Sequence, residues 1–223
     1  MGSPPLLHLW FDVISPYAYL GWCRVHEVAA RHGRRVDPVP VLFAALLDAH
    51  GQKGPAEIAP KRIYTFKHVV RIAADHGIVL LPPPSHPFNP LLGLRIAALP
   101  MPDGERRRAI DAVFAAVWAG GPGVEDPEAL ARWLSARGLP GADLVAAAQT
   151  SEAKARVRET TAAALAAGVF GVPTFGAGGE LFWGQDSLDH VERFLRGEDP
   201  IDEHVLASWV GISATATRPG SRS

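Results

Sequence analysis

The stretch FDVISPYAYLGW, residues 11–22, predicts a buried strand that turns directly into a helix. Residues 7–12, LHLWFD, are apolar or favour β structure apart from one histidine and one aspartate, which is typical of a strand covered on both faces of a sheet. Pro16 suits the first position of a helix, where its missing N–H costs no hydrogen bond. The residues that follow have helical spacing: Tyr19, Leu20, Cys23 and Val28.

Ser15 stands at the turn itself, and its position predicts a helix N-cap. In the simplest interpretation, its hydroxyl satisfies an unpaired backbone N–H at the start of the helix, a contribution of about 1 kcal/mol. In a functional interpretation, the turn directs N–H groups and the positive end of the helix dipole at whatever lies above it, which favours an anion or a thiolate. The stretch alone leaves both interpretations open.

The composition is that of a globular protein, with 223 residues, 48% hydrophobic and 20% charged. This length allows one domain, or one domain that carries a large insertion. The formal net charge is -1, and the basic clusters RHGRR and ERRR are short. Such clusters are typical of solvated helix ends, so we expect no nucleic-acid partner.

The chain contains no apolar run that approaches the roughly 20 residues of a membrane span, so we expect no membrane association. Residues 1–12, MGSPPLLHLWFD, lack the basic region of a signal peptide and reach an aspartate early. This pattern predicts a cytoplasmic location.

Cys23 is the single cysteine of the chain, which excludes an intrachain disulfide, a CxxC redox pair and a zinc ribbon. We expect its thiol to be buried and inert. The histidines, among them His26, His32 and His76, show neither an HExxH pattern nor a matching carboxylate spacing, so we expect no metal site. Any thiol chemistry must therefore use a sulfur from outside the chain.

Residues 36–43, VDPVPVLF, predict a second strand. Alternate residues share one face: Val39, Val41 and Phe43. Pro38 and Pro40 cannot donate to a strand ladder, which places this strand at the edge of a sheet. Together with the first strand and the helix between them, it predicts a parallel, right-handed βαβ unit.

From about Leu46 to Gly168 the apolar residues recur with helical spacing, which predicts an all-helical insertion. The positions that define this spacing are Ile63, Phe66 and Val70; Ile110, Val113, Phe114, Val117 and Trp118; and Leu130, Trp133 and Leu134. Helix starts are marked by Pro60, Pro127 and Pro140, and the rigid stretch PPPSHPFNP, residues 82–90, connects two helices.

Strands return in GVPTFGAGGELFWG, residues 171–184, where PTFGA and ELFW predict a hairpin around a glycine turn. Residues 184–187, GQDS, then open a helix. Its inward residues are Leu188, Val191, Phe194 and Leu195. After Pro200 we expect one short helix and then a disordered tail, SATATRPGSRS.

The order of these elements, βαβ, helices and then ββα, predicts an α/β fold: a thioredoxin-like core interrupted by a large all-helical insertion domain. In this division, residues 1–45 and 169–200 form the two halves of the core, and residues 46–168 form the insertion. Residues 201–223 form the short helix and the tail.

Three segments resemble one known family: DVISPYAYL at residues 12–20, GVPTF at 171–175 and FWGQD at 182–186. They are similar to segments of the 2-hydroxychromene-2-carboxylate isomerases and the kappa-class glutathione S-transferases, relatives of the DsbA-type thiol-disulfide oxidoreductases. The order and spacing match from Leu6 to about Leu195. The redox relatives carry CxxC where this chain has SPYA, so disulfide exchange by protein cysteines is excluded.

The resemblance implies that glutathione is the cofactor and that Ser15 is catalytic, as a hydrogen-bond donor to the glutathione sulfur. A free thiol has a pKa of about 8.5, and a helix N-terminus with a hydroxyl donor favours its thiolate. The resemblance also makes Pro173 a cis-proline. A cis bond would turn the backbone of Val172 outward, so that its N–H and C=O pair with glutathione like an added strand. A trans proline at the start of an edge strand is the alternative.

The family likeness assigns the γ-glutamyl end of glutathione to Gln185 and Asp186, with Trp183 and Gly184 beside them. The start of a helix suits the α-carboxylate, and Asp186 suits the ammonium group. Helix capping by Asp186 is the structural alternative, and it is compatible with this role.

Three further residues follow from the same likeness. Lys61 matches a lysine that approaches the glycine carboxylate of glutathione, although a lysine in a first helical turn is usually only solvated. Gln52 stands where the family often has asparagine, and its longer amide would make the same contact. Asn89 resembles a residue that faces the aromatic substrate, or else it forms a turn between two prolines.

Two departures from the family pattern concern the neighbouring ion pairs and selectivity. Ser187 stands where the family commonly has arginine, and His68 stands where it commonly has aspartate. Neither departure touches the predicted cap at Ser15.

The family likeness implies a glutathione-dependent cis/trans isomerase that acts on an aromatic 2-oxo acid or its cyclic hemiketal. The glutathione thiolate would add reversibly to a conjugated carbon, allow rotation and then leave, so no protein nucleophile is required. Two alternatives stay open: a kappa-like transferase that conjugates electrophiles, and a non-catalytic protein that binds a peptide or partner through its cis-proline loop. The relatives also suggest a homodimer.

Overall fold

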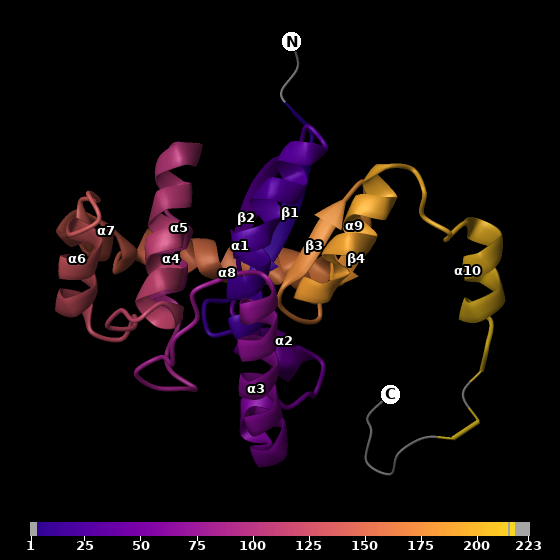
Figure 1. Cartoon of the computed structure of the whole chain (residues 1–223), viewed down its shortest axis with the longest axis horizontal. Coiled ribbons are helices and arrows are strands. Elements are labelled where there is room, and N and C mark those ends of the chain that lie inside the picture. Colours follow the sequence, from indigo (N-terminus) through magenta and orange to yellow (C-terminus); the bar gives the residue numbers. More distant parts are fainter. Residues whose placement is uncertain (1–3, 214, 217–223) are drawn as a thin grey trace.

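The computed structural model describes residues 4–213, 215 and 216, which form a four-stranded mixed sheet with helices around it (Figure 1). The strands are β1 (Leu6–Phe11), β2 (Arg35–Pro40), β3 (Thr174–Ala177) and β4 (Glu180–Trp183). The α-helices are α1 (Pro16–Arg31), α2 (Phe43–Ala49), α3 (Ala59–Asp75), α4 (Leu91–Ala97), α5 (Asp103–Trp118), α6 (Pro127–Ser135), α7 (Gly141–Ala148), α8 (Ser151–Ala166), α9 (Leu188–Leu195) and α10 (Glu203–Val210). Short 3₁₀ helices, η1 (Pro55–Glu57) and η2 (Gln185–Ser187), precede α3 and α9.

The sheet has the order β2-β1-β3-β4, with β1 parallel to β2 and antiparallel to β3, and with β3 antiparallel to β4. The predicted parallel βαβ unit, the later hairpin and the thioredoxin-like core are therefore confirmed. β2 lies at the edge, as its prolines predict. The side chains of Arg106 and Thr160 donate hydrogen bonds to the carbonyl oxygens of Pro38 and Pro40, which protects this edge from pairing with a further strand.

Apolar side chains cover both faces of the sheet. On one face, Leu7, Leu9 and Phe11 are fully buried and belong to a cluster that includes residues of α1 and α9. On the other face, Trp10 and Val39 pack with residues of α2 and α8. Burial on both faces explains why β1 is an almost continuous apolar run.

The helices α4 to α7 extend the first cluster away from the sheet, and Figure 1 shows them to one side of it. Trp118, at the end of α5, is buried, and its indole N–H donates to the carbonyl oxygen of Val13 at 2.9 Å. Trp22 of α1 donates to the carboxylate of Asp111 in α5 at 2.6 Å. The helical segment therefore shares one core with the sheet.

The second strand is shorter than predicted, because β2 ends at Pro40 and Phe43 begins α2. The N–H of Val41 still donates to the carbonyl oxygen of Phe11 in β1, but side chains accept from the two N–H groups that follow. The N–H of Leu42 donates to Oγ1 of Thr161, and the N–H of Phe43 donates to the carboxylate of Asp12. These bonds turn the chain into a helix, so the domain boundary expected after residue 45 falls inside α2.

The helical spacing predicted for residues 63, 66 and 70 corresponds to α3, but of these three residues only Phe66 packs against the core. Ile63 and Val70 are 58% and 59% exposed, and Phe66 is only partly buried. The buried residues of α3 are Val69 and Ala73. α3 extends beyond the sheet (Figure 1), and most of its residues are exposed.

The C-terminal part follows the prediction closely. In α9, Leu188 and Val191 are buried, while Phe194 and Leu195 are partly buried. The short helix expected after Pro200 is α10, which Figure 1 shows apart from the sheet. The tail predicted to be disordered lies largely outside the described residues. In the described part of the chain, no helix has the length and apolar character needed to span a bilayer.

Candidate functional site

Ser15 caps α1, as its position at the turn predicts. Its backbone is extended, with φ -89° and ψ 116°, and its hydroxyl oxygen accepts a hydrogen bond from the N–H of Ala18 at 3.2 Å. The residue is only 7% exposed. Within the described chain, the hydroxyl hydrogen of Ser15 has no acceptor. The hydroxyl can therefore donate to a ligand while its oxygen caps the helix.

Asp12 supports this turn, a role that was not predicted from the sequence. Its fully buried carboxylate accepts hydrogen bonds from the N–H groups of Ile14 at 3.0 Å and Phe43 at 2.9 Å, and its carbonyl oxygen accepts from the N–H of Ser15. Burial raises the pKa of Asp12 to about 7, although the backbone hydrogen bonds act in the opposite direction. In the sequence, the feature that could have indicated this role of Asp12 is a single acidic residue at the end of the predicted buried strand.

His86, from the proline-rich connection, contacts the same turn and was also missed. Its Nε2 lies 3.1 Å from the carbonyl oxygen of Ile14, which can only accept, so the ring carries a proton at Nε2. Burial lowers the pKa of His86 and so favours the neutral ring. Its Nδ1 is buried and has no partner among the residues that the structure describes. The rings of Phe66 and Trp118 pack around it, so a neutral imidazole fixes the residue before Ser15.

The loop of residues 171–173 lies against α1, and the Val172–Pro173 peptide is cis, as predicted. A Cβ atom placed on Gly21 of α1 would lie 3.5 Å from Cγ of Pro173, so the two segments are in contact. The carbonyl oxygen of Pro173 accepts from the N–H of Gly184 at 2.9 Å. Across the described ranges, neither the N–H nor the C=O of Val172 has a hydrogen-bonding partner. Both groups are available to an extended ligand.

Trp183 and Gly184 follow at the end of the hairpin. Trp183 is 58% exposed, and its ring centroid lies 5.3 Å from that of Phe170. A Cβ atom on Gly171 would lie 2.6 Å from the indole nitrogen of Trp183, so the indole covers the loop that contains Val172. Gly184 has φ 95°, a conformation that favours glycine, and it turns the chain into η2.

Gln185 and Asp186, the first residues of η2, differ in exposure. Gln185 is buried, and the guanidinium group of Arg24 donates to its side-chain oxygen at 3.0 Å, which ties η2 to α1. Asp186 is exposed and forms no ion pair with any described residue. Burial raises the pKa of Tyr17, and the charge of Asp186 adds to this effect. Asp186 is thus an exposed carboxylate that no cation in the described part of the chain neutralises by an ion pair.

Tyr17 and His68 link the first turn of α1 to α3. The Tyr17 hydroxyl and Nδ1 of His68 share a hydrogen bond of 2.8 Å. The ring of Tyr64 lies 5.6 Å from the His68 ring. His68, which stands where the family commonly has aspartate, therefore forms a hydrogen bond with a tyrosine. Tyr17 was missed, although an aromatic hydroxyl two residues after Ser15 was a usable signal.

Three predicted site residues are peripheral or locally engaged. Lys61 is exposed in the first turn of α3, roughly 10 Å along the helix from His68. Gln52 is exposed in the segment that follows α2. The side-chain oxygen of Asn89 accepts from the N–H of Leu91 at 3.1 Å, which forms the turn at the start of α4. The ligand roles of Lys61, Gln52 and Asn89 stay predictions.

Cys23 is exposed, so its predicted burial is wrong. It lines a cavity of about 220 Å³ between α1 and α5, where it faces residues such as Asp111. Partial burial of the thiol there raises the pKa of Cys23 to about 11, so the thiol stays protonated at neutral pH. Among the described residues, no cluster of histidine, cysteine or acidic side chains has the composition of a metal site.

Comparison with known proteins agrees with the thioredoxin-like fold. Residues 6–196 match the family model described as DSBA-like thioredoxin domain. The chain is 27% identical over 192 residues to a 2-hydroxychromene-2-carboxylate isomerase of Sphingobium xenophagum, covering 85% of this chain and 97% of that protein. It is 23% identical over 187 residues to Glutathione S-transferase kappa 1 of Rattus norvegicus, covering 77% and 80%.

A solved structure of a 2-hydroxychromene-2-carboxylate isomerase is similar to this fold, with a TM-score of 0.79 and 25% sequence identity over 86% of this chain and 95% of that one. The family match runs from the start of β1 to just beyond α9, and it includes the Ser15 turn, the helical insertion and the loop at Val172. The chain therefore belongs to the family of DSBA-like thioredoxin domains.

Proposed function

We propose that this protein is a glutathione-dependent cis/trans isomerase of the 2-hydroxychromene-2-carboxylate type that acts on an aromatic 2-oxo acid. The isomerase and transferase names of its relatives support an enzymatic activity. The observation that carries the proposal is that two groups near α1 have no hydrogen-bonding partner among the described residues: the hydroxyl hydrogen of Ser15 and the backbone of Val172. Glutathione offers a thiol and a peptide backbone, the two groups that this pair would bind.

Two of the described residues suit particular chemical groups of glutathione. Val172 offers an N–H and a C=O for the peptide, and the exposed carboxylate of Asp186 suits the ammonium group. Gln185 fits less directly because its side-chain oxygen already accepts from Arg24. We assign Gln185 to the attachment of η2 to α1, through which it positions Asp186.

The remaining predicted residues take peripheral roles in this proposal. Trp183 and Gly184 would border the peptide of glutathione, since the Trp183 indole covers the loop next to Val172. The exposed side chains of Lys61 and Gln52 would approach its glycine end. Asn89 would lie toward the aromatic substrate while its side-chain oxygen accepts from the N–H of Leu91.

When bound, glutathione would supply a thiolate that adds to a conjugated carbon of the substrate and leaves again after rotation. The role of the protein residues is to keep the glutathione sulfur ionised and in position. The Ser15 hydroxyl donates to the sulfur, and the dipole of α1 favours negative charge at the same point. Asp12 and His86 hold the backbone of this turn, so the donor is oriented before a ligand arrives.

Turnover of 2-hydroxychromene-2-carboxylate, with and without glutathione, tests the proposal when free glutathione is assayed at the end. Isomer formation that requires glutathione and leaves it undiminished is the expected result. Stoichiometric loss of glutathione would instead support the kappa-like transferase, the alternative favoured by the similarity to the rat enzyme. Binding of glutathione or a peptide without any turnover would indicate a non-catalytic binding protein.

A further inference from the structure

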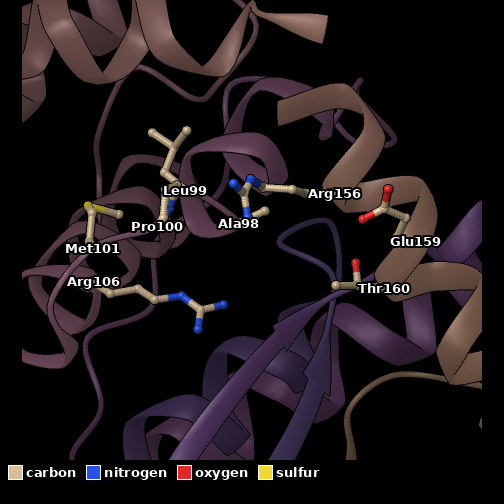
Figure 2. A pocket seen from close by; sticks show the side chains of 8 residues that line it. All are labelled: Ala98, Leu99, Pro100, Met101, Arg106, Arg156, Glu159 and Thr160. Atoms are coloured by element: carbon tan, nitrogen blue, oxygen red, sulfur yellow. The ribbon is translucent and has the colours of Figure 1, made fainter. Parts of the chain in front are cut away.

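A cavity of about 300 Å³ lies between α5, α8 and the connection from α4 to α5. Six of the residues that line it are Leu99, Pro100, Met101, Arg106, Arg156 and Glu159 (Figure 2). This volume is at the lower end of small-molecule sites. We propose that the cavity binds a small organic carboxylate with an apolar body.

Arg106 provides a fixed cation at this cavity. Its Nε donates to the carbonyl oxygen of Ala97 at 2.9 Å, and its Nη2 donates to that of Pro38 at 2.6 Å. These two bonds hold the guanidinium plane in place. Its Nη1 has only a long contact of 3.9 Å with the carboxylate of Asp37, so this nitrogen keeps donors for a ligand.

Arg156, from α8, provides the second cation. Its side chain is exposed, and it forms no ion pair with the residues that the structure describes. Figure 2 shows the guanidinium groups of Arg106 and Arg156 bordering the same cavity from different elements. One guanidinium group held by hydrogen bonds and one exposed guanidinium group suit a planar carboxylate, which accepts from the two-pronged donors of arginine.

The other residues that line the cavity restrict the kind of ligand that it can bind. Leu99, Pro100 and Met101 form an apolar wall, which favours an apolar body over an inorganic ion. Glu159 also borders the cavity, and its charge disfavours a dianion such as phosphate. Thr160 donates its hydrogen to the carbonyl oxygen of Pro40, so its hydroxyl can only accept from a ligand.

The cavity lies along the edge strand, because Arg106 and Thr160 both bond to carbonyl oxygens of β2. The Ser15 turn and the loop at Val172 contribute nothing to its lining. The inference therefore stands apart from the proposed glutathione site, and either can fail without the other.

Benzoate is the probe, and the methyl group of Met101 is the reporter. The chain has 2 methionines, so isotope labelling of methionine methyl groups gives a simple spectrum, and Met101→Leu assigns the Met101 signal. We expect benzoate to shift this signal with a dissociation constant on the order of a millimolar. Inorganic phosphate should bind more weakly than benzoate at the same ionic strength.

Two substitutions with opposite effects separate a ligand site from a structural one. Arg156→Ala should weaken benzoate binding at least about fivefold, and Glu159→Gln should strengthen it about two- to fivefold. Arg158→Ala, an exposed arginine of the same helix outside the cavity lining, should change the affinity less than about twofold.

Three results would overturn the proposal. The first is an unchanged Met101 signal at about 20 mM benzoate. The second is equal affinity in the Arg156→Ala and Arg158→Ala proteins. The third is phosphate binding as tight as benzoate binding, which would remove the apolar body from the ligand class.

Discussion

Ser15 has two roles at one hydroxyl group: its oxygen caps α1, and its hydrogen is available to a ligand. Alanine removes both roles, whereas glycine removes the hydroxyl but costs the helix only a few tenths of a kcal/mol. We expect both Ser15→Ala and Ser15→Gly to raise the pKa of bound glutathione by roughly one to two pH units, because a hydrogen bond to a charge contributes about 1.5–3 kcal/mol. Thiolate absorbance of the complex, followed against pH, measures this.

The stability of the two Ser15 variants is the control for capping. Ser15→Ala should unfold at a lower denaturant concentration than Ser15→Gly, while the glutathione pKa shifts alike in both. Both variants should keep some activity that recovers as the pH rises, because the helix dipole stays in place. Titration curves identical to those of the unsubstituted protein would leave Ser15 as a helix cap alone.

Asp186 is the second residue whose role can be tested alone. Asp186→Ala removes an exposed carboxylate that has no ion-pair partner in the described chain, so the fold should hardly change. Loss of a charge-assisted contact with the ligand ammonium should weaken glutathione binding roughly ten- to a hundredfold by calorimetric titration. Asp189→Ala, an exposed aspartate at the start of α9, is the matched control. Equal affinities of these two variants would remove Asp186 from the site.

At the scale of elements, the close crossing of α6 and α7 depends on one glycine. A Cβ atom on Gly141 would overlap the backbone carbonyl oxygen of Ala131, so Gly141→Ala must push the two helices apart. We expect a loss of about 1–3 kcal/mol in the free energy of unfolding, measured by denaturant titration. In Gly104→Ala of α5, the added methyl group meets no atom of the described residues within 4 Å, so the substitution should be neutral or stabilise by about 0.5 kcal/mol. Equal effects of the two substitutions would contradict this interpretation.

The elements also differ in how well local pattern predicts them. The spacing of apolar residues and the positions of prolines were sufficient for α1 and α6, and two β-prone runs around a glycine turn were sufficient for the hairpin, because these signals act within a few residues. The end of β2 was wrong because Asp12 and Thr161, both distant in sequence, take the N–H groups of Phe43 and Leu42. A local pattern contains no information about such donors and acceptors.

At the scale of the whole molecule, Trp118 connects the helical insertion to the Ser15 turn through the carbonyl oxygen of Val13. Trp118→Phe leaves this buried oxygen without its donor and should cost about 1–3 kcal/mol of stability. Trp133→Phe removes a comparable bond to Ala112, but within the insertion. Both variants should lose stability in denaturant titrations, and only Trp118→Phe should also weaken glutathione binding. An equal loss of glutathione affinity in Trp118→Phe and Trp133→Phe would show that the hydrogen bond from Trp118 to Val13 has no specific effect on the site.

The stability of the whole chain should depend on pH through Asp12. Its pKa is about 7 in the folded state and 3.8 in the absence of the fold, so the folded state holds more protons between these values. The free energy of unfolding should therefore fall as the pH rises from about 4 to about 7, by an amount on the order of a few kcal/mol. Denaturant titrations across this range should show a smaller slope for Asp12→Asn. Asp48→Asn, at an exposed position, should keep the slope of the unsubstituted protein.

The sequence by itself determined the order of the elements, the edge position of β2, the N-cap at Ser15 and the family to which the turn, the Val172 loop and the Asp186 segment are similar. These features depend on hydrophobic period, proline chemistry and short motifs, which all lie within a few residues. The candidate site was accordingly predicted where its residues belong to those motifs.

Only the tertiary structure decided which side chains support that site. Asp12 bonds to a residue 31 positions away, Tyr17 to His68 across 51 positions, and His86 to Ile14 across 72. It also decided that Cys23 and two apolar residues of α3, Ile63 and Val70, face solvent. Periodicity shows that a face is apolar, but whether it is covered depends on segments that the chain brings together only when it folds.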